Sequence, residues 1–265
     1  LLNLYPGSAA AYSLRKLNAN YTGSAILVQD TVGGATKAIG FDANGDLDTV
    51  ELLAYAGSND VFVETWFDQS GSGNNATQPS SGARPKIVSL GVVIVDANGK
   101  PTVEFDGSKI IYIGNYSSLT EGELFTTVRW LGDTTTRGGF KISTNGFDMH
   151  FPYFGGAVYD NFGSTTRYSF TPSITLNQLN LYNTLSKSGE WTARLNSNVE
   201  TTSATNTVGF SSGGIGSYTM NHHFSEFIIY NAVQSTANRT GIEENVGGYY
   251  DIPLPGLLVT RLRGL

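Results

Sequence analysis

The sequence predicts an all-β fold, a sandwich of two antiparallel sheets with a short helix near each end. Hydrophobic residues make up 40% of the 265 positions and charged residues only 14%, while Gly (32), Tyr (14) and Phe (14) are abundant. This composition is typical of many short strands joined by tight turns. Strand-like runs also recur at roughly the spacing expected of a sandwich. A chain of this length fits one large all-β domain.

Charge and residue types exclude several classes of function. The formal net charge is −6 and the pI about 5.0, so the chain has no broad basic face for a phosphate backbone. The absence of cysteine excludes disulfides, thiolate zinc sites and cysteine nucleophiles. No apolar run approaches the roughly 20 residues that span a bilayer. We therefore expect no nucleic-acid partner, no membrane insertion, no metal and no cofactor.

The first regular element is predicted to be a helix over 8–17. Ala10, Leu14 and Leu17 recur at the helical spacing i, i+4, i+7, and Ser8 is a candidate N-cap.

Two further helices are predicted. One covers 48–55 and ends before Gly57, and the other covers 235–250 with Ser235 as its N-cap. The remaining regular segments are predicted to be strands, bounded by turns rich in Gly, Asn, Asp and Ser. These strands cover 25–29, 38–41, 61–67, 84–88, 91–95, 101–107, 124–130, 139–142, 147–151, 156–160, 166–170, 179–182, 189–195 and 224–230.

The turn over 42–46 admits two interpretations. Asp42, Asn44 and Asp46 alternate like the first ligands of a calcium loop, but Gly45 stands at the fourth position instead of the sixth, and no Glu stands at the twelfth. A plain Asn-Gly hairpin turn fits the residues better.

The strand over 61–67 delivers a polar, glycine-rich loop to one edge of the fold. This loop begins with Asp68 and Gln69 and continues to Gln78. An Asp before Gln-Ser-Gly closes a turn through its own side chain, or it contacts a ligand; the first use is the commoner one.

Aromatic residues are unusually dense between Phe147 and Phe162, where acidic residues interrupt them. Sugar sites combine an aromatic face, which meets the apolar side of a pyranose, with polar groups that fix the hydroxyls. The residues that we single out for such a site are Tyr153, Tyr159, Asp160 and Asn161, together with Asp68 and Gln69 of the polar loop. The alternative is that the rings fill the space between the sheets.

Two other motifs point less clearly to function. The segment 209–213 matches G-x-S-x-G by letter, but it lies in a Gly/Ser-rich loop without the strand and helix that a nucleophile elbow requires. His222 and His223 are adjacent, and adjacent residues on a strand face opposite sides, so the two side chains cannot easily share a metal ion.

Several N-terminal motifs resemble the catalytic domain of family 54 arabinofuranosidases and its concanavalin A-like or laminin-G-like relatives, which are frequent in bacteriophage tail and other virion proteins. The resemblance covers most of residues 8 to 252. The residues that carry it are Ala11-Tyr12-Ser13-Leu14-Arg15, Tyr21-Thr22-Gly23, Trp66-Phe67-Asp68-Gln69-Ser70-Gly71-Ser72-Gly73-Asn74, Ala76-Thr77-Gln78 and Arg84-Pro85-Lys86-Ile87-Val88.

The catalytic pattern of that family does not carry over to this sequence. The counterpart of the segment before the nucleophilic Glu is 159–163, and Ser164, Thr165 and Thr166 follow it. The counterpart of the turn before the acid/base Asp is 215–218, which also has no carboxylate. Since glycoside hydrolysis usually needs two facing carboxyls, the resemblance implies a relative without catalytic residues.

The resemblance implies a concanavalin A-like sandwich over 8–252, with a linker over 1–7 and an apolar linker or docking tail over 253–265. It implies a non-enzymatic module of a virion appendage, such as a phage tail fibre or spike, for assembly, for binding host-surface glycans, or for both. The expected partners are a cell-surface polysaccharide or glycan, other virion subunits and further copies in a homo-oligomer, in a virion or extracellular setting. An arabinofuranosidase-like glycoside hydrolase and a purely structural virion protein are the alternatives.

Overall fold

The computed structural model describes residues 1–107, 109–132, 138–216 and 220–255. Its helices are α1 (Thr49–Ala56), α2 (Thr236–Tyr250) and the short 3-10 helix η1 (Ser81–Ala83). The strands are β1 (Ser8–Ser13), β2 (Ile26–Asp30), β3 (Lys37–Ile39), β4 (Val61–Trp66), β5 (Ala76–Thr77), β6 (Lys86–Ser89), β7 (Val92–Val93), β8 (Val103–Gly107), β9 (Ile110–Asn115), β10 (Glu121–Trp130), β11 (Phe140–Lys141), β12 (Val158–Asp160), β13 (Tyr168–Phe170), β14 (Asn180–Lys187), β15 (Glu190–Leu195), β16 (Asn198–Ser203), β17 (Ser212–Gly216) and β18 (Met220–Tyr230).

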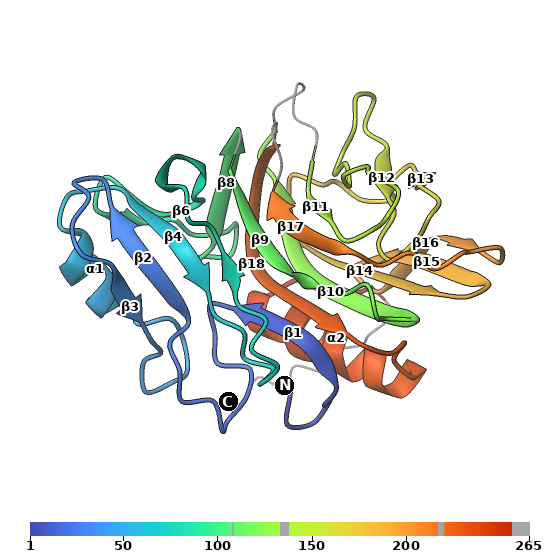
Figure 1. Cartoon of the computed structure of the whole chain (residues 1–265), viewed down its shortest axis with the longest axis horizontal. Helices are drawn as coiled ribbons and strands as arrows, with labels where there is room; N and C mark the ends of the chain where they lie inside the picture. The colour runs from blue at the N-terminus through green and yellow to red at the C-terminus, as the bar shows by residue number, and fades with distance from the viewer. Residues whose placement is uncertain (108, 133–137, 217–219, 256–265) are drawn as a thin grey trace, which may run out of the picture.

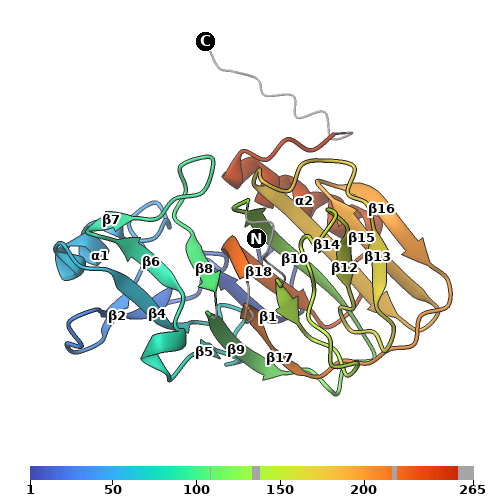
Figure 2. The same cartoon turned by 90° about the horizontal axis from the view of Figure 1, so that it is seen from above.

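Most strands join one antiparallel network (Figure 1). Its main path runs β11-β17-β9-β5-β4-β6-β8-β18-β10-β14-β15-β16, while β12 and β13 form a separate pair. The elements α1, β2, β4, β6 and β7 gather at one end of the molecule, and β10, β14, β15, β16 and α2 gather at the other (Figure 2). The predicted all-β sandwich is confirmed. No helix of the described residues is long and apolar enough to cross a membrane.

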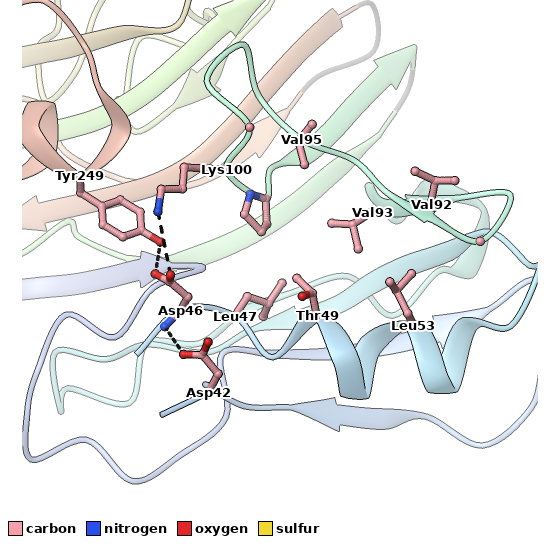
Figure 3. A pocket seen from close by; sticks show the side chains of 13 residues that line it. Asp42, Asp46, Leu47, Thr49, Leu53, Val92, Val93, Val95, Lys100 and Tyr249 are labelled. Atoms are coloured by element: carbon pink, nitrogen blue, oxygen red, sulfur yellow. Dashed lines mark hydrogen bonds and ion pairs between the residues drawn. The ribbon is translucent and has the colours of Figure 1, made fainter. Parts of the chain in front are cut away.

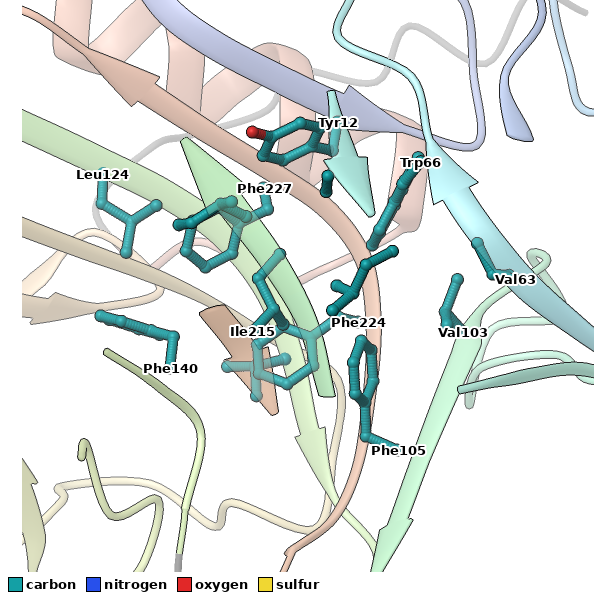
Figure 4. Packing of buried hydrophobic residues seen from close by; sticks show 14 of the residues in the cluster. Tyr12, Val63, Trp66, Val103, Phe105, Leu124, Phe140, Ile215, Phe224 and Phe227 are labelled. Carbon is teal, nitrogen blue, oxygen red and sulfur yellow. The ribbon is translucent and has the colours of Figure 1, made fainter. Parts of the chain in front are cut away.

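The main apolar core brings the β10 and β18 strands against β11 and β17 (Figure 4). The Phe227 ring of β18 meets Phe140 of β11 edge-on, with 5.4 Å between the ring centroids. Tyr12 and Trp66 fill another part of this core, 6.2 Å apart. The edge-to-face contact of Phe227 with Phe140 adds stabilisation beyond the area that the two rings bury.

A second apolar cluster joins α2 to the other face of β10, β14 and β18. Along β18 the side chains alternate, as a strand requires: Phe227 and Ile229 enter the main core, and Ile228 and Tyr230 enter the second cluster. Leu2 and Leu254 also belong to this cluster, although both lie outside the range predicted for the sandwich domain. The part of the predicted docking tail after residue 255 lies outside the described residues.

The helix predicted over 8–17 is wrong, because this segment contains the strand β1, which pairs with β18. β1 is covered on both faces: Ala10 and Tyr12 pack in the main core and Ala11 packs in the second cluster. A strand that is buried on both faces shows no apolar/polar alternation, so its sequence does not differ in pattern from a buried helix.

The strand predicted over 147–151 is also wrong, since the segment makes only an isolated bridge between His150 and Tyr159. In contrast, α1 and α2 lie where helices are predicted, and Asp48 and Ser235 cap them through their side chains. The turn over 42–46 is the predicted hairpin turn: Asp42 Oδ1 accepts hydrogen bonds from the backbone N–H groups of Asn44 (2.8 Å) and Asp46 (2.9 Å).

Candidate functional site

Asp68 and Gln69 hold the polar loop to β1 by hydrogen bonds. Both were singled out from the sequence. Asp68 is buried, and its Oδ1 accepts hydrogen bonds from the backbone N–H groups of Ala11 and Ser70, both at 2.8 Å. Gln69 is fully buried; its Oε1 accepts from Leu17 N (2.7 Å) and its Nε2 donates to two carbonyl groups of the β1 segment. This geometry favours the turn-closing use of both side chains.

Asp160 and Asn161 are buried as well, beneath the aromatic segment. Asp160 accepts hydrogen bonds from Phe162 N (2.9 Å) and from the Tyr182 hydroxyl (2.8 Å), and burial raises the pKa of its carboxyl. Asn161 Nδ2 donates to the Phe147 carbonyl at 2.9 Å. The two residues therefore hold the loop that carries the more exposed aromatic rings.

Tyr153 and Tyr159 belong to an aromatic shelf, which we define as Phe147, His150, Tyr153, Phe154 and Tyr159. Tyr153 stacks on His150 with 4.8 Å between the ring centroids, and it lies 5.4 Å from Tyr159 and 5.1 Å from Phe154. Phe147 and Phe154 are 57% and 45% exposed. The shelf thus presents rings to solvent as well as to one another.

Arg167 connects the shelf with Asp148. Its guanidinium lies 5.0 Å from the centre of the Tyr159 ring and 5.4 Å from that of Phe147, at the range of cation–π attraction. Nη2 donates a hydrogen bond to the Asp148 carbonyl at 2.8 Å. Burial lowers the pKa of Arg167, while the neighbouring Tyr159 and Asp148 oppose that shift.

Beside the shelf is a groove of about 370 Å³ that we call the Asp148 groove. Burial raises the pKa of the Asp148 carboxyl, although Lys141 and Arg167 act against the shift. Lys141 donates one hydrogen bond, to the Gly146 carbonyl at 3.3 Å, and Tyr112 on the wall is 51% exposed. The residues that form the groove are Ile110, Tyr112, Ile113, Lys141, Asp148, Ser212, Gly213, Gly214 and Gly216.

The carboxylate of Asp148 accepts no hydrogen bond from the residues that the structure describes. A half-buried acceptor beside the ammonium group of Lys141 suits a ligand with neighbouring hydroxyls, because a hydroxyl both donates and accepts. Asp148 is one of the acidic residues that interrupt the aromatic segment in the sequence, but sequence reasoning missed Tyr112, Lys141 and Arg167.

One side of the groove is built from the glycine-rich strand β17, which lies between β9 and β11 (Figure 1). At Gly213 a Cβ atom would lie 1.6 Å from the Lys141 carbonyl oxygen, so no other residue fits against β11 at this register. This close approach of two backbones brings Lys141 to the groove.

A larger hollow of about 530 Å³ lies between α1, the β7 hairpin and the end of α2 (Figure 3). Leu53, Val92 and Val93 form an apolar part of its wall, and Tyr249 lies at the polar end, where its hydroxyl donates to Asp46 at 2.5 Å. Arg15 and Lys100 lie 4.5 and 4.1 Å from the centre of the Tyr249 ring. Both cations lie within the range of cation–π attraction to this ring, so the ring is less open to a ligand than the exposed Tyr112 ring of the Asp148 groove.

The other residues considered in the sequence analysis contact neighbours within the fold. His222 and His223 face different neighbours, since His222 Nε2 contacts the Phe151 carbonyl and His223 Nε2 lies 3.3 Å from Glu104. No group of three or more His, Cys, Asp or Glu residues that could hold a metal occurs in the described parts of the chain. Ser164, which follows the counterpart of the family's nucleophile segment, is buried and donates to Asn206 at 2.6 Å. Residues 217 and 218 of the second counterpart lie outside the described residues.

Comparisons with known proteins show the fold. No family model and no curated protein matches the chain. Among solved structures, an arabinofuranosidase complexed with arabinofuranosyl-α-1,2-xylobiose is similar over 90% of this chain, with a TM-score of 0.69 and 14% identity. The similarity covers 62% of that chain, so this protein spans less than two thirds of it. A family 54 α-L-arabinofuranosidase soaked with a cyclic sulfate inhibitor gives the same values.

Two other similar structures share less of the fold. The binding domain of botulinum neurotoxin serotype D matches 68% of this chain and 48% of its own, with a TM-score of 0.50 and 10% identity. A Trypanosoma rangeli sialidase in complex with the inhibitor DANA matches 68% of this chain and 30% of its own, again with a TM-score of 0.50 and 10% identity. The chain therefore has the sandwich architecture of these proteins.

Proposed function

We propose that this protein is a carbohydrate-binding module and that the Asp148 groove with its aromatic shelf is the binding site. The observation that supports this most directly is the half-buried Asp148 carboxyl, which shares its groove with Lys141 and with the exposed ring of Tyr112. Aromatic faces bind the apolar side of a sugar ring, and a few fixed polar groups select its hydroxyls.

A glycan array followed by calorimetry tests the proposal with the full chain. We expect at least one glycan to bind. Asp148→Asn and Tyr112→Ala should each weaken the affinity roughly tenfold, which corresponds to about 1.4 kcal/mol of binding free energy. Glu244→Gln, which removes the same charge from an exposed site on α2, is the matched control and leaves binding unchanged. An array without hits, or equal losses in the control, would remove the support for the proposal.

The second candidate is an arabinofuranosidase-like glycoside hydrolase. The raised pKa of Asp148 favours it, because the general acid of a glycoside hydrolase is a carboxyl whose pKa its surroundings raise. Turnover of an aryl arabinofuranoside that disappears in Asp148→Asn but persists in Glu244→Gln would establish the hydrolase and replace the binding module.

The virion setting is a separate proposal that rests on the sequence resemblance. It predicts that the chain assembles as a homo-oligomer with other virion subunits and binds a host-surface glycan, in a virion or an extracellular location. Light scattering on the purified chain tests the oligomer, and the genes beside this one test the setting: virion-assembly genes would support it.

A further inference from the structure

We infer that the hollow between α1, the β7 hairpin and the end of α2 is the docking surface for the C-terminal segment 256–265 of the same chain. The inference is independent of glycan binding, because among the described residues the hollow and the Asp148 groove have no lining residue in common. It assigns a binding surface to the docking tail that the sequence predicts.

The hollow has aliphatic side chains on two sides. Leu47 and Leu53 lie on one side, and Val92, Val93 and Val95 lie on the other (Figure 3). Leu47 is buried, but Val92 and Val95 are 68% and 44% exposed. An apolar surface that stays open to solvent in this way is typical of an interaction site, and a volume of about 530 Å³ accommodates several side chains of a peptide.

The polar end of the hollow is acidic. Asp46 accepts a hydrogen bond from the Tyr249 hydroxyl, and the ammonium group of Lys100 lies 3.9 Å from its carboxylate. Asp42 is exposed and binds groups of its own turn, at Asn44 and Asp46; within the described part of the chain, no Lys or Arg forms an ion pair with it. The occupant that fits the hollow therefore combines aliphatic side chains with a positive charge.

The C-terminal segment has this composition. Its ten residues include four Leu, one Val and two Arg, and none of them is acidic. The aliphatic run Leu257-Leu258-Val259 suits the apolar walls, and Arg261 and Arg263 supply cations for Asp42.

The last described residues lie close to the hollow. Tyr249 lines it from the last turn of α2, and Ile252 N donates a hydrogen bond back to the Gly247 carbonyl at 2.9 Å. Leu254 also packs at Gly247, where a Cβ atom would lie 2.6 Å from its Cδ1. Gly247 and Tyr249 are within one turn of the same helix, about 5 Å of its length, whereas ten residues span up to about 33 Å. The segment can therefore reach the hollow of its own molecule.

Tryptic cleavage of the full chain after Arg261 and Arg263 tests the docking, because a docked segment is cut only when it is released. Val92→Asp, which places a charge on the apolar wall, should speed both cleavages roughly tenfold. Val199→Asp makes the same change at an exposed valine of β16 and is the matched control, which leaves both rates unchanged. Asp42→Asn keeps an acceptor for the turn but removes the charge, and should speed cleavage roughly two- to fivefold.

Paramagnetic relaxation in the full chain identifies which copy supplies the segment. The chain has no cysteine, so Gly264→Cys provides a single site for a nitroxide label. The label should broaden the methyl signals of Leu53, Val92 and Val93 in its own molecule and leave those of Val199 sharp. A mixture of isotope-labelled chains without the nitroxide and nitroxide-labelled chains without the isotope should show no broadening.

Three results would overturn the inference. Equal cleavage rates in the parent chain, Val92→Asp and Val199→Asp would show that the segment does not dock on the apolar wall. Broadening of the hollow's signals in the mixture alone would assign the surface to the segment of a second copy. Sharp signals in both samples would exclude the segment as the occupant. Each of these results leaves the proposed glycan binding untouched, because that function is measured at the Asp148 groove.

Discussion

Asp148 and Asp160 show how one residue type takes two roles in neighbouring parts of the chain. Burial raises the pKa of both carboxyls, but Asp160 is fully buried and accepts hydrogen bonds from Tyr182 and from backbone N–H groups. Asp148 is half-buried and lies in a groove. Both lie in the aromatic segment, so a sequence pattern cannot separate them; only the depth of each side chain does.

His222 makes the stability of the fold depend on pH. The imidazole is fully buried, and burial lowers its pKa to about 4. Its Nδ1 accepts a hydrogen bond from Asn221 N (3.2 Å) and its Nε2 contacts the Phe151 carbonyl, so the neutral ring has one donor and one acceptor in use. A second proton would place an N–H of the ring against the N–H of Asn221.

The sign of this effect follows from the unfolded chain, in which histidine has a pKa of about 6.5 and takes up its proton first as the pH falls. The stability that the neutral His222 contributes is fully present above about pH 6.5. It is lost as the pH falls from about 6.5 to 4, and the free energy of unfolding then drops by about 3 kcal/mol. Urea denaturation across this range should show a smaller loss in His222→Gln than in the parent chain. Parallel pH profiles for the two proteins would contradict the assignment.

At the level of single residues, two of the residues singled out in the sequence lie in the candidate site. Tyr153 and Tyr159 lie on the shelf where an aromatic sugar site is expected. Tyr112 was not predicted as a site residue, because no strand was predicted around it. Lys141 and Arg167 were not predicted either, because their positions depend on contacts between distant segments. The predicted ligand role of Asp68, Gln69, Asp160 and Asn161 stays a prediction, and their burial favours a structural one.

Among the elements, β1, β9 and β17 show where sequence patterns fail. β1 is apolar on both faces, so its sequence resembles that of a buried helix. The sequence of β17 is Ser-Gly-Gly-Ile-Gly, which resembles that of a loop. Strand pairing with β9 and β11 overrides the low strand preference of glycine in β17. Capped helices such as α1 and α2 were predictable because their end signals are local.

The packing of β17 on β11 can be tested at Gly213. A methyl group there would collide with the Lys141 carbonyl, so we expect Gly213→Ala to lower the free energy of unfolding by about 1–3 kcal/mol and to weaken glycan binding. Gly248→Ala is the matched control: apart from its chain neighbours and the backbone of its own helix, no atom lies within 4 Å of a Cβ at this site. It should raise stability by about 0.5–1 kcal/mol, because alanine favours a helix over glycine. Chemical denaturation measures both, and a neutral Gly213→Ala would refute the close approach.

In the whole molecule, β18 joins the two apolar layers, as β1 and β10 also do. Phe227 and Ile229 pack in the sandwich core, and Ile228 and Tyr230 pack in the apolar layer beneath α2. Two buried ion pairs reinforce the second layer: Arg15 with Glu226 at 2.8 Å, and Arg239 of α2 with Glu123 at 2.5 Å. A disturbance in either layer therefore reaches the other through the strands that the two layers share.

This arrangement predicts that the layers unfold together. Ile242→Ala, in α2, should lower the free energy of unfolding by about 2–5 kcal/mol through the cavity that it leaves. The fluorescence of Trp66 and Trp191, both in the main core, should shift to the same lower denaturant midpoint as the far-ultraviolet dichroism. Loss of dichroism before the fluorescence change would show that α2 detaches independently.

The glycines in the wall of the Asp148 groove limit the number of side chains that can determine which ligand the groove prefers. Gly213 and Gly214 leave backbone on one side of the groove, so under the proposed function the side chains that would meet a sugar there come from other segments, among them Tyr112, Lys141 and Asp148. These three are exposed or half-buried, and none belongs to the main core. Exchanging them in a mutant library should therefore change the preferred glycan while the fold tolerates the exchange, which makes this groove a practical starting point for selecting new sugar specificities.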